Sequence, residues 1–264
     1  RIRDKSRANL VACASDALGS RSVTRIAMEF LFLFGLAGLM AAFSNDDDAD
    51  DSSTPEVESA TDDVLRGGPA ADDFSATPAF APLFGGDGND TLEGAAGDDR
   101  LFGGTGQDIL VGGAGDDFIR GGADPDVITG DAGSDTLVGD GGPDLLLAED
   151  LIAGSDVADI ARTSNDPASA LADAVDPQAA TGEADVAIGG AGEDFIIFGS
   201  NDTITGGADG DVFATGFWLD PAAPADITDY TPGADVLIYQ SETEAALDVT
   251  FGENADGDAT LTID

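Results

Sequence analysis

Aspartate recurs at every ninth residue through the middle of this 264-residue chain. The series comprises Asp90, Asp99, Asp108, Asp117, Asp126, Asp135 and Asp144. Carboxylate oxygens are hard ligands, and a hard cation such as calcium binds about six to eight oxygens at about 2.3–2.6 Å. One carboxylate per repeat supplies too few oxygens, so the other positions of the repeat decide whether a cation site forms.

The seven repeats fill residues 85–147 and share glycine at position 1, aspartate at position 6 and Leu or Ile at position 8. Further glycines lie at positions 2 and 4, among them Gly86, Gly88, Gly104, Gly106, Gly113 and Gly115. Glycine permits the positive φ of a tight turn, and such a turn exposes backbone carbonyl oxygens to a cation. We therefore interpret each repeat as a six-residue turn and a three-residue strand. Two such turns stacked about 4.8 Å apart could share one ion.

This pattern resembles the G-G-x-G-x-D-x-U-x repeat of RTX (haemolysin-type) calcium-binding proteins. The resemblance implies an all-β fold, a parallel β-roll (right-handed β-solenoid) in which two repeats form one coil of 18 residues. The aspartates sharing an ion would be Asp90/Asp108, Asp99/Asp117, Asp108/Asp126, Asp117/Asp135 and Asp126/Asp144, giving up to about five calcium ions in this block. Position 8 would alternate between two walls, with Leu92, Leu110, Ile128 and Leu146 on one and Leu101, Ile119 and Leu137 on the other.

The thin core and the repeated carboxylates predict that folding depends on metal. One inward side chain per rung cannot stabilise the roll alone. Carboxylates stacked about 5 Å apart repel by roughly 1–3 kcal/mol per pair at intermediate dielectric. We expect a roll that is largely unfolded without calcium and folded with it.

Several repeats depart from the pattern. Position 2 is Ala95, Asp131 or Asp140 in three of them, and position 4 is Asp124 in another. Side chains there are expected to crowd the turn, which weakens the prediction for sites that use Asp126, Asp135 and Asp144; alternatively, Asp124 adds a ligand.

A second, irregular block covers residues 181–214, where Asp185, Asp194, Asp202 and Asp211 hold the ligand position. The step from Asp194 to Asp202 is eight residues instead of nine. Between the two blocks, residues 148–180 break the repeat, and Asn165-Asp166-Pro167 followed by ASALADAV predicts a short helical excursion.

Composition limits the classes of function. The formal net charge of −43 argues against nucleic acid as a partner. The chain has no histidine, which excludes His-based triads and HExxH zinc sites, and we find no nucleophile elbow or phosphate-binding loop. We therefore expect that it is not an enzyme. Its one cysteine, Cys13, excludes an internal disulfide.

The N-terminal segment, residues 1–43, contains the apolar run FLFLFGLAGLMAAF within residues 28–43. A signal-peptide core and a short membrane anchor are both favoured over a buried helix, because the next segment is acidic. We expect Met28 to be the natural start. Residues 44–84 predict an acidic disordered linker, with a degenerate turn near Gly67–Phe74 and Leu83 in phase with position 8.

Residues 215–264 predict a C-terminal β cap that protects the open edge of the solenoid. ADITDY, TPG and ADVLIY indicate strand, turn and strand, and ALDVTFG and DATLTI flank the turn of a second hairpin. The first stretch resembles the segment that closes RTX rolls. We expect the cap to be truncated at Asp264.

The leading hypothesis is a calcium-binding protein that is secreted by, or displayed on the surface of, a Gram-negative bacterium. The resemblance implies export by type I secretion and folding on meeting extracellular calcium. Two alternatives stay open: an adhesion module that binds cell-surface or matrix polysaccharide, and an accessory module of a larger RTX enzyme. The oligomeric state and the target do not follow from the sequence.

Overall fold

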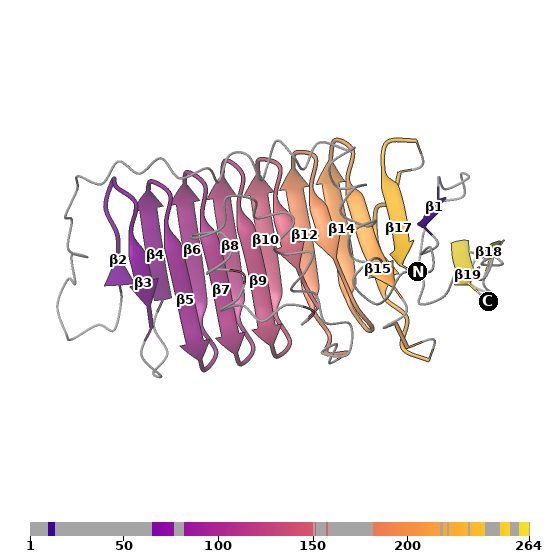
Figure 1. The fold of residues 1–264 in the computed structure, drawn as a ribbon, viewed down its shortest axis with the longest axis horizontal. Coiled ribbons are helices and arrows are strands. Elements are labelled where there is room, and N and C mark those ends of the chain that lie inside the picture. The colour runs from indigo at the N-terminus through magenta and orange to yellow at the C-terminus, as the bar shows by residue number, and fades with distance from the viewer. Residues whose placement is uncertain are drawn as a thin grey trace, which may run out of the picture.

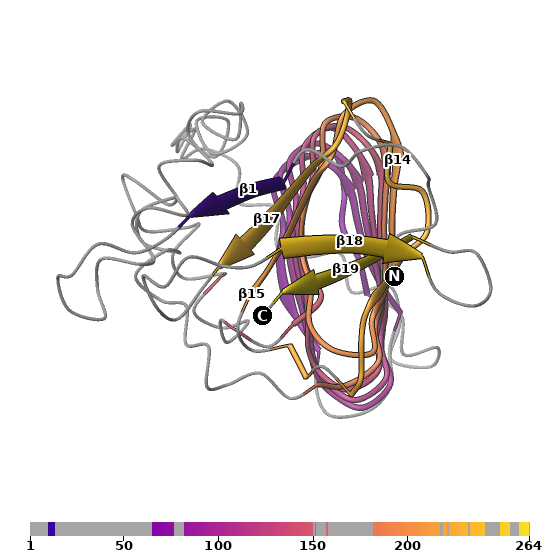
Figure 2. The same cartoon turned by 90° about the vertical axis from the view of Figure 1, so that its right-hand side faces the viewer.

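The computed structural model describes residues 10–13, 65–76, 82–149, 151, 157, 182–216, 219–220, 222–231, 233–240, 249–253 and 259–263. These residues are almost entirely strand and form a β-solenoid whose coils stack along the long axis of the molecule (Figure 1). Two parallel sheets face each other, and the chain passes from one to the other in every coil. Seen from the end, the coils superimpose as a flattened loop (Figure 2).

One sheet, called the even sheet here, has eight strands in the order β16-β14-β12-β10-β8-β6-β4-β2. In chain order they are β2 (Leu65–Arg66), β4 (Pro82–Asp87), β6 (Arg100–Thr105), β8 (Phe118–Ala123), β10 (Thr136–Gly141), β12 (Val186–Ala191), β14 (Thr203–Ala208) and β16 (Asp226–Ile227).

The opposite sheet, called the odd sheet, has nine strands in the order β1-β17-β15-β13-β11-β9-β7-β5-β3. In chain order they are β1 (Leu10–Cys13), β3 (Asp73–Ser75), β5 (Thr91–Ala96), β7 (Ile109–Ala114), β9 (Val127–Ala132), β11 (Leu145–Leu147), β13 (Phe195–Ile197), β15 (Val212–Gly216) and β17 (Val236–Gln240). The predicted parallel β-roll is therefore confirmed.

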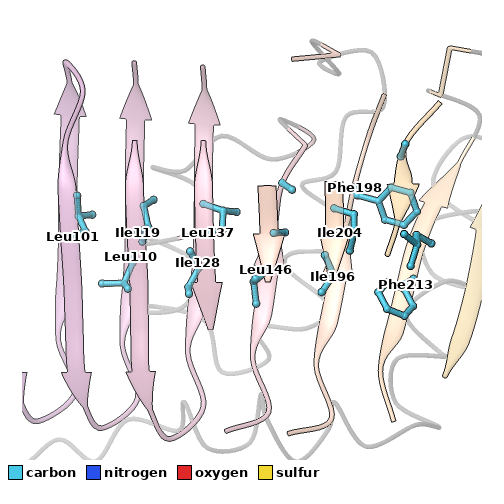
Figure 3. Close-up of a cluster of buried hydrophobic side chains, with 14 of the residues drawn as sticks. Leu101, Leu110, Ile119, Ile128, Leu137, Leu146, Ile196, Phe198, Ile204 and Phe213 are labelled. Carbon is cyan, nitrogen blue, oxygen red and sulfur yellow. The ribbon is translucent and has the colours of Figure 1, made fainter. Parts of the chain in front are cut away.

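Register follows from the side chain at position 8, because only that residue of each rung points into the space between the sheets. Leu92, Leu110, Ile128 and Leu146 align across the odd sheet, and Leu101, Ile119 and Leu137 align across the even sheet. All seven are fully buried in one continuous core. Figure 3 shows the part of this core that runs from Leu101 to Leu146 and on to Phe213. This confirms the two predicted walls, and it places the turns between position 8 residues along the two long edges of the roll.

The second block continues the same register after the insertion. Thr136 pairs with Val186 and Leu146 with Ile196. The chain therefore leaves the roll at the end of one coil, and after the insertion it resumes at the equivalent position of the next coil. The following coil is one residue shorter, and its turn holds Asn201 at a φ of 71°. The side-chain amide of Asn201 donates to the carbonyl of Gly182 at 2.8 Å. The helical excursion expected within residues 148–180 lies outside the described residues.

The roll begins before the first regular repeat. Residues 65–76 and 82–84, which the sequence analysis assigns to the linker, form β2, β3 and the start of β4. Leu83 is fully buried and aligns with Leu101, as its phase predicts, while Phe74 aligns with Leu92. The degenerate turn at Gly67–Phe74 is thus a rung of the solenoid.

The strands predicted at ADITDY and ADVLIY are present, but they do not pair with each other. β16 pairs in parallel with β14 of the even sheet, and β17 pairs in parallel with β15 of the odd sheet, so they continue the solenoid. Tyr230, in the turn between them, is buried against Phe213, and its hydroxyl donates to the carbonyl of Asp235. The second hairpin is confirmed, because β18 (Val249–Glu253) and β19 (Ala259–Ile263) pair antiparallel.

The N-terminal strand β1 pairs in parallel with β17 and is the last strand of the odd sheet. The apolar run of residues 30–43 lies outside the described residues. Among the residues that are described, no helix is long and apolar enough to span a bilayer.

Candidate metal centre

The aspartates at position 6 form two ladders, one along each edge of the roll. In each ladder the backbone N–H of one aspartate donates to Oδ1 of the aspartate one coil further on, as Asp90 does to Asp108 at 2.8 Å and Asp117 to Asp135 at 2.8 Å. The first ladder runs through Asp72, Asp90, Asp108, Asp126, Asp144, Asp194, Asp211 and Asp235. The second runs through Asp99, Asp117, Asp135, Asp185 and Asp202.

Every pair of aspartates predicted to share an ion is therefore adjacent within a ladder. The ladders also cross the insertion, since Asp135 donates to Asp185 and Asp144 to Asp194. The hydrogen bond through Oδ1 fixes each carboxylate inside the turn, so its second oxygen is held in a defined direction.

That second oxygen has no hydrogen-bond partner in the interior of the roll. Within the described part of the chain, Oδ2 is buried and unsatisfied in Asp90, Asp108, Asp117, Asp126, Asp144 and Asp194. A buried carboxylate oxygen without a donor is costly, because it has lost its hydration and gained nothing in return. Its repetition at the same position in successive turns indicates a ligand common to these turns.

Glycine at position 1 keeps the space beside this oxygen clear of a side chain. A Cβ atom added at Gly103 would clash with Oδ2 of Asp108 and would lie 2.6 Å from the carbonyl oxygen of Gly121, one coil further on. The same two atoms, an aspartate Oδ2 and a carbonyl oxygen of the next coil, face the glycine in other repeats, for example at Gly139 and Gly189. A hard anionic oxygen and a carbonyl oxygen therefore converge on one cradle.

The carbonyl oxygens of positions 2 and 4 also face the neighbouring turn. Those of Gly86 and Gly88 point at Gly104 and Gly106, and that of Gly115 points at Gly133, so closely that a Cβ atom on the receiving glycine would clash. The six glycines nominated from the sequence, Gly86, Gly88, Gly104, Gly106, Gly113 and Gly115, all adopt positive φ between 108° and 137°. The turns thus stack as peptide groups whose carbonyl oxygens face the next turn.

Burial makes the ladder carboxylates hard to ionise. Desolvation raises the pKa of Asp126 to about 9, although the hydrogen bond from the N–H of Asp108 opposes the shift, and the charges of Asp108 and Asp144 add to it. For the same main reason the pKa is raised to about 8 for Asp144, to about 7 for Asp90, Asp108 and Asp211, and to about 6 for Asp117 and Asp194. At neutral pH Asp126 and Asp144 therefore hold a proton unless a cation takes its place, and the carboxylates with lower pKa values ionise at a cost that a cation would offset.

The non-glycine residues at positions 2 and 4 do not interrupt the stack. Ala95, Asp131, Asp140 and Asp124 adopt left-handed φ between 64° and 75°. Asp131 keeps its register with Gly113, and Asp140 keeps its register with Gly122 and Gly190. The expected crowding is avoided because the backbone of these residues reaches the left-handed region that aspartate tolerates better than most residues. Asp124 accepts a hydrogen bond from the N–H of Gly106 at 3.3 Å, and its role as a metal ligand stays a prediction.

Aspartates near the ends of the ladders are satisfied differently. Oδ2 of Asp202 accepts the N–H of Gly199 at 2.7 Å, Oδ2 of Asp72 accepts the N–H of Gly68 at 2.8 Å, and Oδ2 of Asp235 accepts the N–H of Thr231. Asp202 was nominated as a ligand, and that assignment stays a prediction for a carboxylate whose second oxygen already has a donor.

Two ladder members, Asp72 and Asp235, were missed by the sequence analysis. Asp72 lies five residues after Gly67, the same spacing as in the regular repeats, so that signal was available. Asp235 has no glycine at the corresponding position, and only the structure reveals it.

Side chains alone do not assemble a metal site in the described residues: no three His, Cys, Asp or Glu side chains come together as a ligand group. This agrees with the composition of the turns, in which each contributes one inward carboxylate and several carbonyls. A hard cation that accepts both oxygen types, as calcium does, fits this donor set better than a soft metal.

Comparison with known proteins agrees with this geometry. A family model described as the RTX calcium-binding nonapeptide repeat matches in four copies, at residues 84–119, 111–146 and 179–201. The chain carries RTX calcium-binding repeats. No curated protein and no solved structure matches the chain with significance.

The RTX repeats imply Ca²⁺ as the bound ion, and the residues present fit it. Oδ2 of the interior aspartates and the turn carbonyls would hold it, and calcium would supply the positive charge that these buried oxygens lack. The ladders extend past the matched residues at both ends, through Asp72 on one side and Asp211 and Asp235 on the other.

Proposed function

We propose that this chain is a non-enzymatic calcium-responsive module of a secreted or cell-surface protein, in which the roll folds when it meets extracellular calcium. The observation that carries this proposal is the series of buried, unsatisfied Oδ2 atoms from Asp90 to Asp194. Without a cation each of these carboxylates opposes folding, and with one each becomes a ligand, so metal binding and folding are coupled.

The cellular setting follows from calcium availability. An RTX roll that folds only with calcium stays unfolded where calcium is scarce, as in the cytoplasm, and folds where it is plentiful. That coupling suits export as an unfolded chain, as in the type I secretion of Gram-negative bacteria. The absence of histidine from the sequence and the lack of a recognisable catalytic motif support a role without catalysis.

Calcium titration of the chelator-treated chain tests the proposal. Far-UV circular dichroism should show a cooperative gain of β structure with calcium and none with magnesium at equal concentration. A spectrum that is already β-rich without metal and indifferent to calcium would overturn it. Replacement of the seven aspartates of the first block by asparagine should abolish the transition, and a retained transition would remove the aspartates from the mechanism.

The number of ions is part of the proposal. Up to about five ions in the first block follow if each stacked pair shares one. Equilibrium dialysis with ⁴⁵Ca²⁺ on the full chain measures the total, and a value of one or two would mean that most pairs hold none.

A further inference from the structure

The two outer faces of the roll differ in burial. On the even sheet the outward residues of β4 to β14 are all exposed or half-buried. On the odd sheet the outward residues of four adjacent strands, β7, β9, β11 and β13, are buried, and only Ile197 among them is half-buried. These side chains point away from the core, and they are buried within a single chain. Another part of the same chain therefore covers them.

The buried apolar residues of the described chain divide into two sets. One set is the continuous core between the sheets. Within the described residues, only the odd sheet and the insertion contribute to the other set, which lies outside that core. Its members are Ile109, Val111, Val127, Leu145, Leu147, Phe195 and Ile238 on the outer face of the sheet, and Leu151 and Val157 in the insertion.

The insertion leaves the roll beside this face. Strand β11 ends at Leu147, and the N–H of Ala148 still donates to the carbonyl of Ile197 on β13 at 2.9 Å. The N–H of Leu151 then donates to the carbonyl of Glu149 at 2.7 Å, which turns the chain away from the path of a regular repeat. Leu151 and Val157 are 2% and 0% exposed. The start of the insertion is thus buried outside the sheet that it leaves.

The buried part of the face is centred near the strand from which the insertion departs. In the odd sheet β11 lies between β9 and β13, and β7 follows β9. Burial decreases at β5, where outward Glu93 is half-buried, and at β15, where Val212 and Ala214 are half-buried. Four strands about 4.8 Å apart span about 14 Å, the length of a helix of about ten residues. The insertion, which replaces a turn of a few residues, is long enough to cover this area.

We propose that the outer face of β7, β9, β11 and β13 is the docking surface of the insertion, residues 150–181, and that the insertion docks only when calcium has assembled the sheet. The sequence of the insertion suits an apolar surface, since it contains Ile152, Ile160, Leu171 and Val175 in addition to the two buried residues. Leu171 and Val175 are four residues apart in the segment predicted as a helix, so a helix would present both on one face. Docking removes apolar surface of both partners from water.

Two other occupants fit the face less well. A second copy is not needed, because the face is buried within a single chain, and a net charge of −43 opposes the association of two copies. The apolar run of residues 30–43 belongs to the connection between β1 and β2, which lie at opposite ends of the roll. A segment following that connection would cover the odd sheet along its whole length, whereas the buried area is limited to the strands around β11.

Hydrogen exchange of the full chain measures docking. With saturating calcium the amides from Leu151 to Val157 should exchange at least about tenfold more slowly than after chelation. Val127→Ser should lower this protection at least about fivefold, because it removes apolar surface from the docking face. Val186→Ser is the matched control, since Val186 is the same residue at the same repeat position on the even sheet, where it is half-buried. It should leave the protection unchanged.

Replacement of the insertion tests the surface directly. Residues 148–184 are exchanged for GGAGE, the sequence that precedes Asp194, so that Asp185 keeps its repeat position. The shortened chain should still gain β structure with calcium. Its uncovered face should then bind Nile red, a neutral dye, with fluorescence at least about threefold above that of the unaltered chain. Equal fluorescence would show that another segment, such as residues 30–43, covers the face, and would overturn the inference.

Circular dichroism of the same samples separates the two proposals. The inference rests on the proposed function, because the odd sheet must form before a segment docks on it. No response of the unaltered chain to calcium would overturn the proposed function and the calcium dependence of docking with it. A normal response with unprotected amides from Leu151 to Val157 would overturn the inference alone, as would equal loss of protection in Val127→Ser and Val186→Ser. Protection that depends on protein concentration would assign the face to a second copy instead.

Discussion

Interior and terminal aspartates of the two ladders show how one residue type performs two tasks. Asp126 and Asp202 both accept a backbone N–H through Oδ1 from the preceding coil. Oδ2 of Asp126 is buried without a partner, whereas Oδ2 of Asp202 accepts the N–H of Gly199. The interior carboxylate needs a cation or a proton, and the terminal one is satisfied by its own turn.

The difference follows from the local chain path. In a regular repeat the five residues before the aspartate form a glycine turn whose carbonyls point along the stack. At Asp202 the turn is shortened, and the N–H of a residue only three positions earlier reaches the carboxylate. At Asp72 and Asp235 a residue four positions earlier donates in the same way. A hydrogen bond within the turn thus satisfies the second oxygen at both ends of the first ladder and at the C-terminal end of the second.

Removal of calcium should have the largest effect and should fall on the interior. We expect the amide protons of Asp90, Asp108 and Asp126 to lose hydrogen-exchange protection by orders of magnitude when calcium is chelated, because the unsatisfied carboxylates then oppose stacking. Amides near Asp235, beside buried Tyr230, should lose less. Equal loss of protection at both places would show that the two kinds of aspartate respond alike to calcium.

Acid should substitute in part for calcium. The folded pKa values of about 7, 9 and 8 for Asp108, Asp126 and Asp144 lie above the ordinary value of 3.8, so the folded roll binds more protons than the unfolded chain between these limits. Stability without calcium should therefore be greatest at low pH and fall as pH rises from about 4 to about 9. Far-UV circular dichroism of the calcium-free chain at pH 5, 7 and 9 measures the folded fraction, and urea unfolding gives the stability at each pH where a folded state is present.

With saturating calcium this fall of stability with rising pH should weaken or reverse, because protons compete with the ion for the same carboxylates. The interior aspartates dominate this behaviour. A calcium-free chain whose urea midpoint rises with pH would contradict the assignment of buried, unsatisfied carboxylates.

Substitution of one interior aspartate should change calcium affinity without weakening the calcium-free fold. Asp126→Asn keeps an oxygen for the N–H of Asp108 and removes the buried charge. Loss of a unit charge within about 4 Å of a divalent ion costs up to about 8 kcal/mol at an effective dielectric of 20, so the calcium midpoint should rise about tenfold or more. Circular dichroism at graded calcium gives the midpoint. A midpoint equal to that of the unaltered chain would exclude Asp126 as a ligand.

The regular part of the roll could be predicted from the sequence because three positions of the repeat are fixed. Gly at position 1 allows the turn, Asp at position 6 supplies the ligand, and Leu or Ile at position 8 forms the core. The pattern predicts Leu101, Ile119 and Leu137 on one wall and Asp90 stacked on Asp108, and the structure has both. The glycine pattern is local, and each 18-residue coil pairs only with the coils next to it, so no distant contact has to be predicted.

The irregular ends could not be predicted in the same way. At Asp235 the turn lacks the position 1 glycine, and the strands on either side of it join opposite sheets although their spacing suggests a hairpin. The hydrogen-bond partner of each Oδ2 also cannot be predicted from the sequence. It depends on whether the backbone N–H three or four residues earlier lies close enough to donate to that oxygen.

The effect least dependent on calcium concerns the terminal cap. Asp202→Ala removes the acceptors for the N–H groups of Asp185 and Gly199, which lie 3.0 Å and 2.7 Å from its oxygens. Each buried donor left without a partner costs about 1–3 kcal/mol, and neither loss involves the ion. The calcium-saturated chain at pH 7 and the calcium-free chain at pH 5, where protons replace the ion, should therefore lose similar stability in urea unfolding, whereas Asp126→Asn should weaken only the saturated form. If Asp202→Ala instead acts only in the presence of calcium, then Asp202 binds the ion, and the boundary between ligand and cap lies one coil further toward the C-terminus.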